Sequence, residues 1–185
     1  EYIRNFIMSK LETNTIDTVS GTTNLTIGST NSSTVTFESG AATGHMSPAW
    51  SAKRGSAQTG VADSSAVTVV CDTEELDTDS AYNTSTGEFT VPSGKAGKYM
   101  IGASYRTNAS GAGTRLACFL TVGGTIIRQT NFNQNSNGEG SSTIHAVLNL
   151  SAGDVVAFKC FQNTGSSVNV EADGKTYFYG YRIGA

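Results

Sequence analysis

From about Pro48 to the end of the chain, short segments of alternating apolar and polar residues follow one another. Turns rich in Gly, Ser, Asn and Asp separate them, and no stretch shows the apolar spacing of a long helix. A period of two is typical of strands that pack one face against a core. We expect strands at residues 66–72, 87–92, 98–107, 114–122, 125–131, 142–150, 154–163, 167–172 and 176–185. This series predicts an all-β protein with a jelly-roll β-sandwich.

Residues 14–47 differ in composition from the segments that follow. Ser, Thr, Asn and Gly dominate, and apolar residues come in sparse pairs. So few apolar groups cannot bury a core within one chain. We predict that three copies wind short strands together into an intertwined trimeric β shaft, preceded by an N-terminal attachment segment at residues 1–13. The alternative is a flexible linker. The apolar contacts of the shaft would come from Leu25, Ile27, Val35 and Phe37.

Several predicted strands are apolar on both faces. We expect the core face of the closing strand to carry Tyr177, Tyr179, Tyr181 and Ile183. Apolar residues on the second faces include Met100, Ala117, Phe119, Phe161 and Phe178. Because the outer faces of an isolated sandwich meet water, grouped apolar residues there usually mark an association surface. We therefore predict a homotrimer interface that includes Met100, Phe119, Phe161 and Phe178.

Composition argues against several classes of function. The net charge is −3 and the 12 Lys and Arg residues do not cluster, which argues against nucleic-acid binding. No apolar run reaches the roughly 18 residues of a membrane span, so membrane insertion is not expected. The cysteines are expected to be small buried apolar residues, although one disulfide with one thiol left over is an alternative. They are Cys71, Cys118 and Cys160.

Motifs for catalysis are missing from the sequence. It has no nucleophile elbow, no phosphate-binding loop and no zinc-protease helix, and His45 and His145 stand alone. A glycan depolymerase would need paired carboxylates at a cleft, and none can be assigned. We therefore expect neither enzymatic activity nor a cofactor.

An acidic run at residues 71–79 offers hard oxygen ligands to calcium, although it lacks the glycine and glutamate spacing of an EF-hand loop. A solvated acidic turn is the alternative interpretation. The candidate ligands are Asp72, Glu74, Asp77 and Asp79.

Two long polar segments, 106–115 and 131–142, are candidate recognition loops, since loops on a rigid sandwich often carry binding. Amide groups and an aromatic ring suit sugar hydroxyls and ring faces. The same composition is also found in ordinary turns, which is the alternative. The candidate receptor or glycan contacts are Arg106, Arg115, Phe132, Asn133, Gln134 and Asn135.

The segment YNTSTGEFTVPSGKAGKYMIGASY, residues 82–105, resembles the signature of the complement component 1q globular head, within the tumour necrosis factor superfamily of trimeric jelly rolls. Two later segments, LNLSAGDVVAFKCFQNTGSSVNV and TYFYGYRIG, resemble later strands of the same family. The resemblance implies a tumour necrosis factor-like jelly-roll head over residues 48–185. The positions that match the signature are Asp79, Tyr82, Thr86, Gly87, Phe89, Thr90, Pro92, Gly97 and Tyr99.

The stalk departs from the vertebrate members, which carry collagen where this chain has Thr-, Ser- and Asn-rich repeats. Together with MSPAWSA at 46–52, the stalk resembles bacteriophage fibre proteins that bear this kind of head. The resemblance implies a homotrimeric virion fibre that is assembled in the host cytoplasm and acts outside the cell. Residues 1–13 would contact tail or capsid proteins, and the head would bind a host surface glycan or protein. The alternative is a structural decoration or head-fibre protein without receptor binding.

Overall fold

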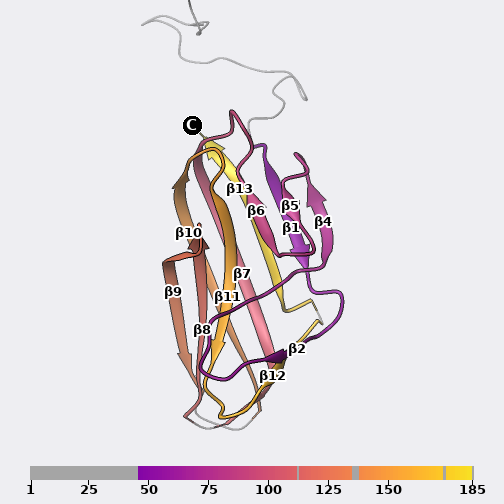
Figure 1. Cartoon of the computed structure of the whole chain (residues 1–185), viewed down its shortest axis with the longest axis vertical. Coiled ribbons are helices and arrows are strands. Elements are labelled where there is room, and N and C mark those ends of the chain that lie inside the picture. Colours follow the sequence, from indigo (N-terminus) through magenta and orange to yellow (C-terminus); the bar gives the residue numbers. More distant parts are fainter. Residues whose placement is uncertain (1–45, 112, 135–137, 173, 185) are drawn as a thin grey trace, which may run out of the picture. The chain divides into compact units, whose positions relative to one another are not determined.

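The computed structural model describes residues 46–111, 113–134, 138–172 and 174–184. Within these ranges the chain is all-β, with no helix that could cross a membrane (Figure 1). The strands of the described residues are β1 (Ala49–Lys53), β2 (Gln58–Val61), β3 (Val67–Thr68), β4 (Thr73–Asp77), β5 (Tyr82–Asn83), β6 (Glu88–Thr90), β7 (Gly97–Ser110), β8 (Arg115–Val122), β9 (Thr125–Asn133), β10 (Gly138–Leu150), β11 (Val155–Gln162), β12 (Val168–Val170) and β13 (Tyr177–Gly184).

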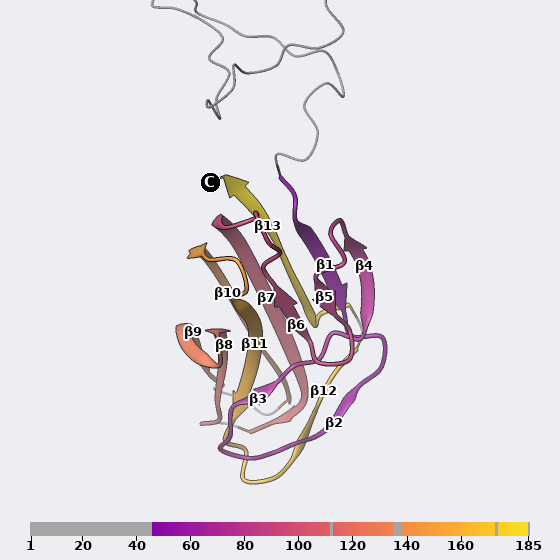
Figure 2. The same cartoon turned by 45° about the horizontal axis from the view of Figure 1, so that its top comes forward.

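The strands form two antiparallel sheets that pack face to face (Figure 2). One sheet has the order β2-β12-β7-β13-β1-β4, and β10 pairs with β7. The other has the order β5-β6-β11-β8-β9, and β3 pairs with β11. This architecture confirms the predicted jelly-roll sandwich. The predicted attachment segment and nearly all of the predicted shaft, including Leu25, Ile27, Val35 and Phe37, lie outside the described residues.

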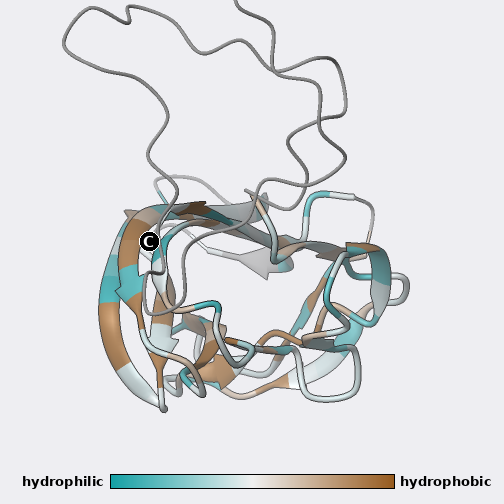
Figure 3. Cartoon of the chain, turned by 90° about the horizontal axis from the view of Figure 1, so that it is seen from above, coloured by the Kyte–Doolittle hydropathy of each residue, from teal (hydrophilic) through white to brown (hydrophobic). Residues whose placement is uncertain are grey.

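The core lies between the two curled layers, which Figure 3 shows end-on. Its centre is aromatic: the rings of Trp50 and Phe89 stack with centroids 3.7 Å apart. The ring of Phe178 meets Trp50 edge-on at 5.5 Å and lies 5.4 Å from Phe158. These four side chains are fully buried. Because Trp50 belongs to β1 and Phe89 to the opposite sheet, their stacking holds the two layers together.

The closing strand β13 faces the opposite way from our prediction. Phe178 points into the core and is 0 % exposed, so its assignment to a trimer interface is wrong. The tyrosines at 177, 179 and 181 alternate with it and lie on the outer face. Gly180 explains why this face of β13 is the buried one, because a Cβ atom there would lie 2.2 Å from the Trp50 ring. Only a glycine at this position leaves room for the indole, and that fixes which face of β13 is buried.

Candidate functional site

The outer face of the sheet formed by β1, β13, β7 and β10 carries a patch of aromatic and apolar side chains. Strand register places Tyr181 beside Met100, and Met100 beside Val147 of β10. In the neighbouring row Tyr179 lies opposite Gly102, which lies opposite His145. We call this patch the tyrosine face and define it as Tyr177, Tyr179, Tyr181, Met100, His145 and Val147. Its side chains are half-buried or exposed in the single chain.

Gly102 shapes the centre of the tyrosine face. A Cβ atom at this position would meet the Tyr179 side chain at 2.5 Å, so the phenol ring lies directly across the glycine. Its hydroxyl is 3.3 Å from Nδ1 of His145, and the Tyr177 ring lies 6.1 Å away. Burial and the neighbouring tyrosines raise the pKa of Tyr179 above its usual range. A phenol with one apolar face and one polar tip is common at protein interfaces.

The tyrosine face continues to a hollow at the edge of the sandwich. Val147 is 55 % exposed, and Ile127 of β9 is 37 % exposed. Both line a hollow of about 290 Å³, whose other lining residues are Val122, Leu148 and Leu150 and the polar Arg128, Asn149 and Asp154. Because β9 and β10 belong to different sheets, the hollow lies where the sandwich is open between its layers. Exposed aliphatic groups that adjoin tyrosines are typical of the centre of a protein interface.

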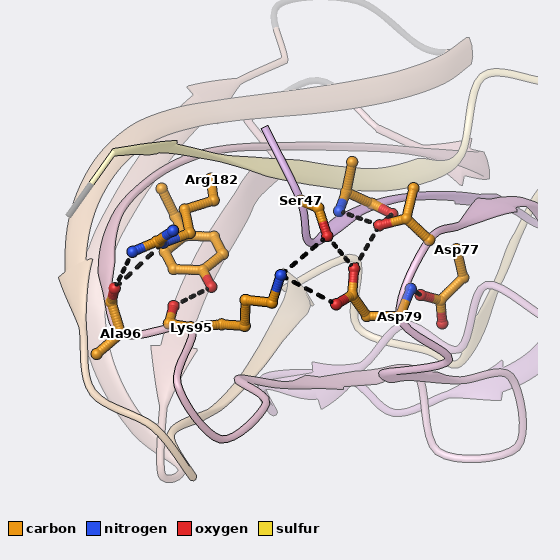
Figure 4. A network of polar contacts seen from close by, with 9 residues as sticks. Ser47, Asp77, Asp79, Lys95, Ala96 and Arg182 are labelled. Atoms are coloured by element: carbon orange, nitrogen blue, oxygen red, sulfur yellow. Dashed lines mark hydrogen bonds and ion pairs between the residues drawn. The ribbon is translucent and has the colours of Figure 1, made fainter. Parts of the chain in front are cut away.

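A polar network surrounds the point where the described chain enters the sandwich. Asp79 accepts hydrogen bonds from the hydroxyls of Ser47 and Thr78, and Nζ of Lys95 lies 3.6 Å from its carboxylate (Figure 4). These hydroxyls, and secondarily Lys95, hold the pKa of Asp79 below its usual range. Arg182 of β13 donates to the carbonyl of Ala96 at 2.8 Å nearby. The network thus ties the entry of β1 to the turn before β7.

Replacing Asp79 by Asn should lower the melting temperature at pH 7 by up to about 3 °C, because a partly exposed ion pair contributes little. A depressed folded-state pKa adds stability above the unfolded value of about 3.9, and this is lost as the pH falls through the lower folded value. The two proteins should therefore converge in acid. Thermal melts from pH 7 to pH 2 measure this. A difference that stays constant over that range would contradict the assignment.

A family model for the C1q domain matches residues 49–183. The chain belongs to the C1q domain family. A search of curated proteins finds no match for it. Among solved structures, the globular domain of zebrafish complement 1qA protein has a TM-score of 0.54 at 20 % identity and covers 74 % of this chain and 97 % of its own.

Two tumour necrosis factor-like structures show the same fold as this C1q domain. Eiger TNF from S. frugiperda has a TM-score of 0.54 at 15 % identity and covers 72 % of this chain and 89 % of its own. Murine APRIL has a TM-score of 0.55 at 12 % identity, with coverage of 72 % and 95 %. Identities this low establish a shared fold and nothing finer.

The predicted interface residues are spread over three environments of the C1q domain. Met100 lies on the tyrosine face, and Phe178 lies in the core. Phe119 and Phe161 lie on the outer face of the other sheet, with ring centroids 6.4 Å apart. Phe119 is only 5 % exposed in the single chain, so it has little surface left to give to a partner.

The candidate recognition residues come together at the end of the C1q domain away from Met46 (Figure 1), but several are already engaged. Arg106 forms an ion pair with Glu139. Arg115 donates to Asn131 at 2.8 Å and covers the Phe161 ring at 4.7 Å. Gln134 is 5 % exposed and donates to the Gly138 carbonyl. The exposed candidates in the described chain are Phe132, at 47 %, and Asn133, while Asn135 lies outside it.

The candidate calcium ligands are dispersed rather than convergent. Asp72 accepts hydrogen bonds from the Gly55 N–H and the Ser56 hydroxyl, and Asp77 accepts from the backbone of Tyr82 at 2.7 Å. Glu74 is exposed on β4. In the part of the chain that the structure describes, no three acidic, His or Cys side chains could hold a metal ion together. The acidic run forms strand β4 and its flanking turns, and the calcium site has no geometric support there.

Sequence reasoning missed most of the tyrosine face. Gly102 and Gly180 were the available signals, because a glycine inside a strand marks a close approach of another group. One admits Tyr179 on the outside and the other admits Trp50 on the inside. Read together, these two positions assign an inner and an outer face to β7 and β13.

Proposed function

We propose that the chain is a homotrimeric bacteriophage fibre protein whose C1q domain recognises the host cell surface. C1q- and tumour necrosis factor-like domains are commonly trimeric and take part in binding. The observation that carries the proposal is the tyrosine face, which leaves aromatic and aliphatic groups half-exposed on a single chain. The Thr-, Ser- and Asn-rich segment before the domain supports the fibre.

Self-association would join the tyrosines of β13 in one copy to the hollow at the β9–β10 edge of the next. Val147 lies where the tyrosine face passes into this hollow, and Ile127 lies beyond it. When unlike patches meet head to tail, the assembly closes into a ring if the rotation between copies allows it. Three copies would bury the tyrosines on the inside.

Receptor binding would use the end of the domain opposite the start of β1. The described chain enters the domain before β1, whereas the segments around Gly113 and Gln134 lie at the opposite end (Figure 1). Phe132 and Asn133 are the exposed groups there that suit a sugar ring and its hydroxyls. We propose binding without turnover as the role of this end.

The test is competition for adsorption. Purified fibre should sediment as three chains and should block adsorption of the phage that encodes it. Replacing Phe132 and Asn133 together by Ala should raise the concentration needed for half-inhibition at least about 10-fold, as expected for the loss of a binding hot spot. Gln129→Ala, an exposed change elsewhere on β9, is the control and should block normally.

Two results would overturn parts of this proposal. A trimer that leaves adsorption unchanged would show a structural decoration protein, with no receptor site. Release of soluble sugar from host envelopes by the purified protein would show turnover and contradict the non-enzymatic role.

A further inference from the structure

Two of the three cysteines face each other across neighbouring strands. Cys118 of β8 is the direct register partner of Cys160 of β11. Both side chains point into the core between the sheets, where they are 0 % and 1 % exposed. Both are thiols in this structure. Directly opposed side chains on the same face of an antiparallel pair have neighbouring Cβ atoms.

The register also shows which kind of strand pair the two cysteines form. The Gly123 N–H donates to the Val155 carbonyl at 2.9 Å, which marks a hydrogen-bonded position. Hydrogen-bonded and non-hydrogen-bonded pairs alternate along an antiparallel ladder, and β8 and β11 pair without a register shift. Five positions back along β8, Cys118 and Cys160 therefore form a non-hydrogen-bonded pair.

The edge of β11 that pairs with β3 independently shows that Cys118 and Cys160 form a non-hydrogen-bonded pair. The Val69 N–H donates to the Phe158 carbonyl at 3.1 Å, so Phe158 directs its backbone groups away from β8. Cys160, two residues later, points its backbone the same way, toward Val67 of β3. This is the arrangement that a non-hydrogen-bonded pair with Cys118 requires.

Non-hydrogen-bonded pairs bring the two Cα atoms to about 4.5 Å, which falls within the range of about 4.4–6.8 Å found in disulfides. The other strand neighbour of Cys160 is Val67, so its cross-strand cysteine partner is Cys118. Cys71 lies in the segment between β3 and β4 and is paired with neither.

We propose that Cys118 and Cys160 form a disulfide that joins β8 to β11 inside the core when the chain folds in the presence of a disulfide oxidant. With oxidised glutathione, the Cys118 thiolate attacks one glutathione sulfur, giving a mixed disulfide and releasing one reduced glutathione. The Cys160 thiolate then attacks the Cys118 sulfur and releases the second. Two protein thiols are oxidised to one disulfide, one glutathione disulfide is reduced to two thiols, and the two thiol protons stay with the two glutathiones.

Burial determines when this reaction can take place. Loss of solvent raises the pKa of both thiols well above the usual range, and neither sulfur is accessible in the folded chain. Exchange needs a thiolate and access to it, so the bond has to form before the sandwich closes. Once formed, it is shielded from reductants by the same burial. The pair lies within one chain, so it is independent of self-association.

The experiment is refolding of the denatured, reduced full chain with excess oxidised glutathione, followed by alkylation and peptide mass analysis. The expected product has lost two hydrogen atoms, links the peptides of Cys118 and Cys160, and keeps Cys71 alkylated. Its melting temperature should exceed that of the reduced protein by roughly 5–15 °C. Cys71→Ala should still form the bond, whereas Cys118→Ala should not.

Recovery of folded protein with three alkylated cysteines would overturn the proposal, as would a disulfide that includes Cys71. These outcomes are read from the unaltered chain, so they do not depend on whether a variant folds.

Discussion

Replacing Val147 by Asp should convert the proposed trimer into single chains. Val147 is 55 % exposed on the tyrosine face, so a carboxylate there stays hydrated in the single chain and leaves its core untouched. In the proposed trimer the same carboxylate would lose its water, at a cost of about 3–5 kcal/mol for an unpaired buried charge. Arg128 lines the same hollow as Val147, so we expect the lower end of this range. The dissociation constant should therefore rise roughly 100- to 1000-fold or more. Sedimentation equilibrium at micromolar concentration measures the change.

Ile126→Asp is the matched control for this experiment. Ile126 is 47 % exposed and lies on β9, opposite Thr121 of β8. Both strands belong to the sheet that does not carry the tyrosine face. It receives the same change of charge outside the tyrosine face and outside the lining of the hollow, so this variant should remain a trimer. If Val147→Asp sediments as three chains, the tyrosine face is not the contact surface. If both variants dissociate, the contact extends over the second sheet as well.

Replacing Gly180 by Ala should destabilise the single chain by about 3 kcal/mol, the upper end of the usual cost of overpacking a core. The new methyl group would lie 2.2 Å from the Trp50 ring. That indole is held between Phe89, at 3.7 Å, and the edge of Phe178, so it has no free direction in which to move. Thermal or denaturant unfolding should show a melting temperature lower by roughly 6–12 °C.

Gly184→Ala supplies the control on the same strand. No atom lies within 4 Å of a Cβ built at Gly184, so this change should alter stability by no more than about 0.5 kcal/mol. Equal stability of the two variants would mean that the Trp50 ring can be repacked. The fit between Gly180 and the indole would then not determine which face of β13 is buried.

Much of the sandwich could be predicted from alternation alone. Strands β7, β8, β10, β11 and β13 appear close to their expected bounds, because each carries a regular apolar face that only a buried layer can use. Strand β9 has no buried face, and it was predicted as the partner of β8 across the tight turn at Gly123 and Gly124. The short strands β1, β2, β4 and β5 were missed. The sequence of β4 was interpreted as an acidic turn, since Glu74, Glu75 and Asp77 have low strand propensity. It forms because β1 supplies its hydrogen-bonding partner from a distant part of the sequence.

The site was predicted less well than the fold, for a physical reason. A strand with apolar groups on both faces gives no signal in its period about which face is inside. For this reason Tyr179 was predicted to face the core and Phe178 the outside, which is the reverse of what the structure shows. The choice depends on the shape of neighbouring strands, namely the space at Gly180 and the bulk of Trp50, and on the phenol hydroxyls, which remain near water. Such information appears only when distant strands are brought into register.

The described chain enters the C1q domain at Met46 and leaves it at Gly184 on the same end, where Arg182 donates to the Pro48 carbonyl at 3.0 Å. The domain can therefore be held before residue 46 or after residue 184 without covering its opposite end. A fluorescent protein or an affinity tag joined after Gly184 would sit beside the base of the sandwich. This makes the domain a convenient module for surface display, with its outermost segments open to the medium.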